Sequence, residues 1–322
     1  IVPNRDCGWV PYSLLHVTRP VLSPLLGSTL CRTIDLLSGV SLFALGAYAV
    51  TSMGLATTSG APLPAVWPVL AVMAGLSILK AALRYAEQFL GHLVAFKALE
   101  LLRGQIFRSL IPRSPRVSAT SRSGDLLSRA TKDVDRIEVF FAHTFAPAVS
   151  AVITPLVVLA VIGLKVSWLV ALTVLPFVAL QLLIMPRLGF TASLEASRSS
   201  SAARADLTQH VTDTVQGMSE VVGYGRSRER LDEMARIDAE IAGASRPVGQ
   251  WASVRRGVNQ MASLTAPIAV VVVGAMLPTT GSGAGVPLLA AAAAAVLRMS
   301  ETVRGVEELS GALNASFASA ER

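Results

Sequence analysis

Cysteine is scarce in this chain, and its placement excludes several kinds of chemistry. Cys7 and Cys31 are the only two cysteines, and they form neither a CxxC pair nor a Cys/His set at metal-ligand spacing. Both are therefore predicted to be structural. The sequence also shows no Ser/His/Asp arrangement and no catalytic pair of carboxylates. We predict neither a catalytic residue nor a metal site.

Lysine is almost as rare, and this excludes one kind of nucleotide site. Only Lys80, Lys97, Lys132 and Lys165 are present, and none of them follows a glycine. A P-loop needs a glycine-rich segment that ends in Gly-Lys, followed by serine or threonine. The chain therefore contains no P-loop.

Charge of both signs is sparse, which predicts a membrane protein. Charged residues make up 15% of the chain and hydrophobic residues 52%, whereas a soluble domain carries about 25% charged residues. Mean hydropathy is +0.56. The net charge is +7, but the basic residues sit between apolar segments. That placement favours membrane topology over a nucleic-acid partner.

Six apolar segments are long enough to cross a bilayer, which takes about 20 helical residues. They run roughly from Pro24 to Leu55, Pro64 to Arg108, Val134 to Leu164, Ser167 to Gln216, Ile237 to Leu277 and Pro287 to Glu321. We predict an all-α, polytopic membrane domain over residues 24–322, preceded by a cytoplasmic linker segment, residues 1–23. Spans two to five carry a polar surplus, which we expect to project into water as helical stalks. Candidate kink points inside the spans are Pro155, Pro176, Pro186 and Pro267.

Two long charged connections, residues 97–136 and 187–256, set the predicted orientation. The first holds nine Lys or Arg against four Asp or Glu, which places it in the cytoplasm by the positive-inside rule. Alternation of the spans then puts the second connection and both termini on the same side.

The second long connection carries a regular apolar pattern. Its stripe at i, i+4 and i+8 spacing is typical of a packed amphipathic helix: Leu207, Val211, Val215, Met218 and Val222. Gly217, Gly223 and Gly225 then indicate a turn. The segment is either a solvated helical hairpin or a docking elbow for a cytoplasmic partner.

Two segments of these connections resemble the coupling segments of ABC exporters. They are "RSGDLLSRATKDVDRIEVFF", residues 122–141, and "GMSEVVGYGRSRERLDEM", residues 217–234. The resemblance covers nearly the whole chain and implies the six-helix, long-stalk exporter fold (type IV). It also implies that eight residues couple to nucleotide-binding domains: Gly124, Asp125, Leu126, Arg129, Gly217, Glu220, Tyr224 and Gly225.

A more specific resemblance lies in "RYAEQFLGHLVAFKALELLRGQIFRSLIPRSP", which starts at Arg84. It is similar to the CydC half of the heterodimeric CydDC exporters, although Gly91 replaces a frequent serine and Gln88 a basic residue. This implies a multi-pass protein of the bacterial inner membrane, tied to cytochrome bd assembly, that exports glutathione or cysteine or handles haem. It further implies a CydD-like half, separate or fused, and ATP and Mg held by nucleotide-binding domains outside this chain. Because the chain starts at Ile1, we expect it to be part of a longer polypeptide.

The second span carries a polar arc near its inner end. At 100° per residue, an arc of about 160° holds the candidate substrate-cavity residues: Lys80, Arg84, Tyr85, Glu87, Gln88 and His92. Either Arg84 and Glu87 pair at i, i+3 and His92 packs between helices, or the arc lines a cavity in which His92 is a haem-ligand candidate. Arg298, Glu301 and Arg304 on the last span, and Arg32 and Asp35 on the first, are predicted to pair among themselves.

Two alternatives to a thiol or haem transporter remain open. An exporter with the same architecture could carry a lipid, a peptide or a siderophore. A protein of another class, a membrane scaffold or receptor that transports nothing, would not need its coupling segments to act on a partner ATPase.

Overall fold

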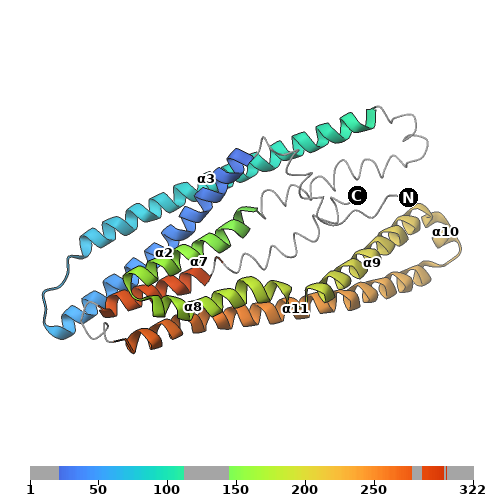
Figure 1. The fold of residues 1–322 in the computed structure, drawn as a ribbon. Helices are drawn as coiled ribbons and strands as arrows, with labels where there is room; N and C mark the ends of the chain where they lie inside the picture. Colours follow the sequence, from blue (N-terminus) through green and yellow to red (C-terminus); the bar gives the residue numbers. More distant parts are fainter. Residues whose placement is uncertain (1–21, 112–144, 278–284, 301, 303–322) are drawn as a thin grey trace. The chain divides into compact units, whose positions relative to one another are not determined.

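The computed structural model describes residues 22–111, 145–277, 285–300 and 302, and within these residues the chain is helical, without strands (Figure 1). Its helices are α2 (Leu22–Ser59), α3 (Val66–Leu110), α7 (Phe145–Lys165), α8 (Trp168–Ala179), α9 (Phe190–Gln216), α10 (Met218–Gly223), α11 (Ser227–Ala275) and a last helix, Gly285–Ser300. The predicted all-α class is confirmed for this part of the chain.

Five described helical segments are long and apolar enough to span a membrane, and the shorter apolar helix Gly285–Ser300 adds a sixth. Their positions match the six predicted spans. The third and sixth spans can be followed only from Phe145 and up to Ser300, because residues 134–144 and 303–321 lie outside the described part. The fifth begins at Ser227, about ten residues before its predicted start.

Two of these helices are much longer than a bilayer is thick. α3 contains 45 residues and α11 contains 49, which corresponds to about 68 Å and 74 Å at 1.5 Å per residue. The hydrocarbon core is about 30 Å thick. The excess length of these helices must therefore lie in water, as expected for stalks.

The chain divides into two compact units. One unit, the bundle unit, comprises Ile1–Leu182 and Met261–Arg322, and the other, the stalk unit, comprises Leu183–Gln260. In the bundle unit, α7, α8, α11 and the last helix bury a core of small and β-branched side chains, with Val40 from α2. Ala292 and Ala295 from the predicted small-residue stretch lie in this core, where short side chains let helices approach closely.

The stalk unit is a helical hairpin made by α9, α10 and the first part of α11. The guanidinium of Arg230 on α11 donates a 2.7 Å hydrogen bond to the hydroxyl of Thr214 on α9. On the same face, Nε2 of His210 lies 2.9 Å from the backbone oxygen of Arg230. These contacts fix α9 against α11 close to the tip of the hairpin.

The fourth predicted span is broken, which the sequence interpretation did not anticipate as a full interruption. After α8, a π-helical turn (Leu180–Ile184) and a 3-10 turn (Met185–Arg187) precede α9. Pro186 lies in this interruption, and Gly189 has a φ of 68°. Pro155, Pro176 and Pro267, in contrast, lie inside helices that continue through them. Of the four predicted kink points, Pro186 is the one that coincides with the interruption.

The predicted packing of the apolar stripe on the stalk is wrong for this chain. Val211, Val215, Met218 and Val222 are all exposed, although they occupy one helical face as predicted. Spacing alone reveals an apolar face but not whether the same chain covers it. The elbow therefore presents an apolar surface.

Candidate functional site

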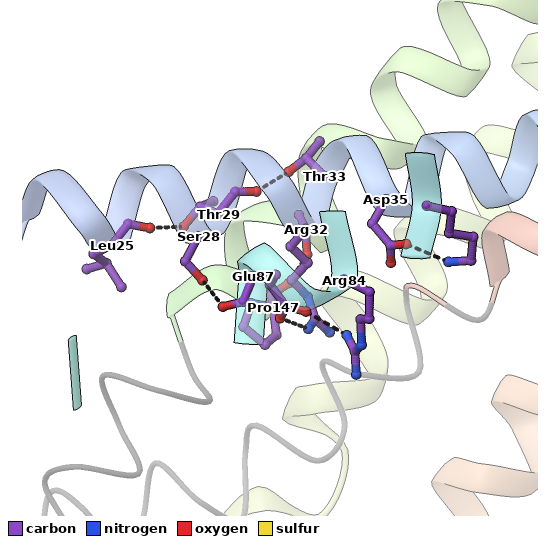
Figure 2. Close-up of polar contacts among 11 residues, drawn as sticks. Leu25, Ser28, Thr29, Arg32, Thr33, Asp35, Arg84, Glu87 and Pro147 are labelled. Carbon is purple, nitrogen blue, oxygen red and sulfur yellow. Dashed lines mark hydrogen bonds and ion pairs between the residues drawn. The ribbon is translucent and has the colours of Figure 1, made fainter. Parts of the chain in front are cut away.

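A buried carboxylate on α3 holds two arginines from two helices. Glu87, whose side chain is only 9% exposed, accepts hydrogen bonds from Arg84 one turn earlier at 2.7 Å and from Arg32 of α2 at 2.8 Å. Figure 2 shows both guanidinium groups directed at this one carboxylate. Buried carboxylates require such partners, because an isolated charge at membrane depth is costly.

A second ion pair joins the same two helices. The ammonium of Lys80 on α3 lies 2.7 Å from a carboxylate oxygen of Asp35 on α2, and the Asp35 side chain is 4% exposed. The cluster between α2 and α3 thus alternates charge along both helices. Among its printed ion pairs, three cations face two carboxylates, so this cluster carries a net positive charge.

The pairing was predicted only in part. The i, i+3 contact between Arg84 and Glu87 is confirmed. The prediction that Arg32 and Asp35 pair with each other is wrong, since Arg32 binds Glu87 and Asp35 binds Lys80. Each therefore finds its partner across the helix interface and not along α2. Glu301 and Arg304 lie outside the described residues.

Small residues allow α2 and α3 to approach closely at this cluster. The Ser28 hydroxyl donates a 3.2 Å hydrogen bond to the backbone oxygen of Glu87. A Cβ added to Gly27 would lie 3.3 Å from Leu90, and one added to Gly91 would lie 3.8 Å from the Ser28 hydroxyl. The space at Gly91 would accept the serine that is frequent in similar sequences.

The predicted polar arc of α3 divides into two faces. Lys80, Arg84 and Glu87 point toward α2 and form the cluster. Tyr85, Gln88 and His92 are exposed in this chain. The arc is therefore not a single continuous lining within one chain.

His92 lies beside an aromatic ring on the exposed face of α3. Its imidazole stacks against Phe96 with ring centroids 6.1 Å apart and an interplanar angle of 25°. Phe89 on the same helix is also exposed. An imidazole with flat apolar neighbours is chemically suited to a planar, largely apolar group.

The last helix brings a further cation to the cluster region. The guanidinium of Arg298 lies over the ring of Phe43 on α2, 5.4 Å from the ring centroid. A Cβ added to Gly39 would lie 3.7 Å from the Lys80 ammonium nitrogen and 3.7 Å from Nε of Arg298. Helices α2, α3 and Gly285–Ser300 therefore converge at Gly39.

Sequence reasoning missed several members of this site. Arg32, Asp35, Gly39 and Phe43 all lie on α2, which was interpreted mainly as a simple span. Charged residues inside an apolar segment were the signal available for Arg32 and Asp35. The closeness of Gly39 to two cations depends on how three helices pack, which the sequence does not reveal.

The coupling residues of the second connection lie at the elbow. Gly217 ends α9, Glu220 is in the first turn of α10, and Tyr224 follows that helix with 81% of its surface exposed. Gly225 adopts a φ of 68° with open space around it, so the chain reverses there at a position that favours glycine. Gly124, Asp125, Leu126 and Arg129 lie outside the described residues.

Groups that could hold a metal ion were sought among the described residues. No set of three or more His, Cys, Asp or Glu side chains is placed to do so there.

Long apolar helices with a charged cluster buried between two of them define a multi-pass membrane protein. The chain matches the family described as ABC transporter transmembrane region over residues 32–291. It belongs to that family.

Three curated relatives have different printed functions. The chain is 32% identical over 173 residues to a probable ABC transporter ATP-binding/permease protein of Haemophilus influenzae, covering 54% of this chain and 31% of that protein. It is 26% identical over 238 residues to the glutathione/L-cysteine transport system ATP-binding/permease protein CydC of Escherichia coli, covering 72% and 39%. It is 25% identical over 162 residues to the beta-(1→2)glucan export ATP-binding/permease protein NdvA of Bartonella quintana, covering 50% and 26%. The matched region spans roughly a third of each relative's length.

Proposed function

We propose that this chain is the transmembrane half of an ATP-driven, CydC-like exporter that moves glutathione or cysteine, or handles haem, in cytochrome bd assembly. The family membership and the printed name of the Escherichia coli relative support this proposal. The observation that carries it is the cationic cluster between α2 and α3, in which Arg32, Lys80 and Arg84 face two buried carboxylates.

The cluster has a chemistry that suits an acidic cargo. Glutathione carries two carboxylates and haem carries two propionates, and both groups form strong hydrogen bonds with ammonium and guanidinium groups. The cluster lies about 30 Å from the predicted outer start of α3, near the inner boundary of the hydrocarbon core. A cargo that leaves the cytoplasm would meet it there.

The rest of the machinery is assigned to partners. We place the protein in a bacterial inner membrane with both termini in the cytoplasm, paired with a CydD-like half that is separate or fused. Nucleotide-binding domains outside this chain would hold ATP and Mg, whose hydrolysis supplies the free energy. The elbow at Gly217, Glu220, Tyr224 and Gly225, and its predicted counterpart at Gly124–Arg129, would rest on those domains.

Alternating access follows from stiff helices that join the elbow to the cluster. α11 is helical without interruption from the stalk into the bundle unit, so motion at the elbow can be transmitted as a rigid displacement. When the stalks of two halves approach, the cavity between the halves turns outward, and when they separate it turns inward. The outward-facing polar side chains Tyr85, Gln88 and His92 would then contribute to the wall shared with the partner.

Haem fits the exposed face of α3 chemically. The stacked His92–Phe96 pair and exposed Phe89 provide an imidazole beside apolar rings, and the exposed part of Arg84 offers a cation for a propionate. A bound haem would supply an iron centre that accepts a nitrogen ligand. Within this chain, His92 would be that ligand, and Phe96 would fix the orientation of the imidazole.

ATP hydrolysis by the full transporter, purified with its partner, tests the cargo assignment. We expect glutathione and haem to stimulate hydrolysis several-fold. The lipid and beta-(1→2)glucan expected of rival exporters should have little effect. His92→Ala should abolish the haem-induced shift of the Soret band and leave the glutathione response intact, and His210→Ala on the stalk is the matched control.

The rival proposals make opposite predictions in that experiment. Stimulation by lipid or glucan alone would favour an exporter of a different cargo. Hydrolysis that no cargo changes would favour a scaffold or receptor. An unchanged Soret band in His92→Ala would remove the haem-ligand role and leave the thiol assignment standing.

A further inference from the structure

Gly39 on α2 marks a point where two cations from other helices meet. The position that a Cβ would occupy lies 3.7 Å from Nζ of Lys80, 3.7 Å from Nε of Arg298 and 3.8 Å from Nη2 of Arg298. Lys80 comes from α3 and Arg298 from the last helix. Because glycine has no side chain, its surface leaves a small space between these two positive groups.

The surroundings of this space are arranged along one face of α2. Asp35, one turn before Gly39, accepts a hydrogen bond from Lys80 at 2.7 Å. Phe43, one turn after Gly39, lies beneath the guanidinium of Arg298. An acceptor on one side and a ring on the other thus hold the two cations around the glycine.

We propose that this space is a carboxylate-binding site for the cargo, with Lys80 and Arg298 as donors and Gly39 as its floor. The proposal rests on the proposed function and specifies how an acidic cargo is recognised. An oxygen near the Cβ position needs an approach of only about half an ångström to reach hydrogen-bond distance from both donors. Guanidinium and ammonium groups that converge on one point bind carboxylates strongly, since both bonds are charge-assisted.

The site can be reached and lies at a depth that suits cargo uptake. The Lys80 side chain is 31% exposed, whereas its partner Asp35 is 4% exposed, so the ammonium keeps an open side. Gly39 lies twenty residues before Ser59, where α2 ends, which corresponds to about 30 Å of helix. That distance places the site near the inner boundary of the hydrocarbon core.

Alanine at position 39 would fill the space without disturbing the fold. The added Cβ would be in ordinary van der Waals contact with both cations, at 3.7 Å. Alanine is also preferred to glycine inside a helix. Gly39→Ala should therefore remove the room for an oxygen and leave the helix bundle intact.

The test measures binding to the full transporter, with its partner half, in lipid nanodiscs. The ligands are glutathione and its diethyl ester, and haem and its dimethyl ester, so each pair differs only in free carboxylates. We expect the wild-type protein to prefer each acid to its ester by about tenfold or more. Gly39→Ala should lose most of that preference, and Arg298→Lys should lose part of it.

Gly54→Ala is the matched control, because Gly54 is also on α2 and a Cβ there would have nothing within 4 Å. It should keep the wild-type preference. The melting temperature of each variant shows whether it has folded, and Arg298→Lys gives a second measure that does not depend on Gly39→Ala.

Two different failures can be told apart. A wild-type transporter that binds acid and ester equally well, or a folded Gly39→Ala variant with undiminished preference, overturns the carboxylate site and leaves thiol or haem transport standing. A wild-type transporter that binds neither glutathione nor haem removes the proposed function, and the site with it. Loss of preference for only one acid identifies which cargo uses the site.

Discussion

A single carboxylate, Glu87, carries much of the polar contact between α2 and α3. It is buried and binds Arg32 and Arg84 together. Removal of one partner from a buried ionic group costs far more than removal of an exposed one, because the remaining charges lose their compensation. The two kinds of partner in this cluster allow that difference to be measured.

Glu87→Ala is expected to destabilise the transporter by about 3 kcal/mol, since it leaves two arginines facing each other in a buried site. Arg84→Ala, the matched control, should cost less than about 1 kcal/mol, because the Arg84 side chain is 53% exposed and Glu87 keeps Arg32. Denaturant-induced unfolding of the detergent-solubilised transporter measures both. Equal losses for the two variants would show that Glu87 does not organise the cluster.

Sequence spacing identified part of this cluster and could not have identified the rest. The contact between Arg84 and Glu87 follows from i, i+3 geometry on one helix. The contacts of Arg32 with Glu87 and of Lys80 with Asp35 depend on the register between α2 and α3. Close packing at Gly27, Ser28 and Gly91 fixes that register, and no pattern within either helix encodes it.

Among the elements, the interrupted fourth span is the clearest departure from expectation. Hydropathy predicted one continuous helix from Ser167 to Gln216, because it reports apolar length and not backbone continuity. The structure has α8, a π-helical turn, a 3-10 turn and then α9. Pro186 was recognised in the sequence, but the left-handed backbone at Gly189 was not.

Gly189→Ala should destabilise the stalk unit strongly. The added Cβ would lie 2.2 Å from the indole of Trp251, and φ is 68°. Gly225→Ala has the same φ with open space around it. It should cost only the backbone strain, about 1–2 kcal/mol.

Melting temperatures of the two glycine variants separate clash from strain. Gly189→Ala should melt well below Gly225→Ala, and Trp251→Ala combined with Gly189→Ala should recover part of the difference. If the two single variants melt at the same temperature, contact with Trp251 does not shape the interruption.

At the scale of the whole molecule, helix lengths were the most predictable property. Long apolar runs with polar continuations predicted stalks, and α3 and α11 have the lengths of such rods. Coverage of the apolar stripe was not predictable, because Val222 and its neighbours are exposed in the chain alone. A surface left uncovered by its own chain is available to a partner, as the proposed coupling role requires.

The central claim is that the elbow couples ATP hydrolysis to movement of an acidic thiol. Inside-out membrane vesicles that contain the full transporter and its partner test this claim most directly, through ATP-dependent uptake of labelled glutathione. Val222→Asp places a charge on the apolar elbow and should reduce uptake about tenfold or more. Thr212→Asp, at an exposed position on α9, should behave as wild type. The account is contradicted if wild-type vesicles show no ATP-dependent uptake, or if Val222→Asp transports glutathione as fast as wild type.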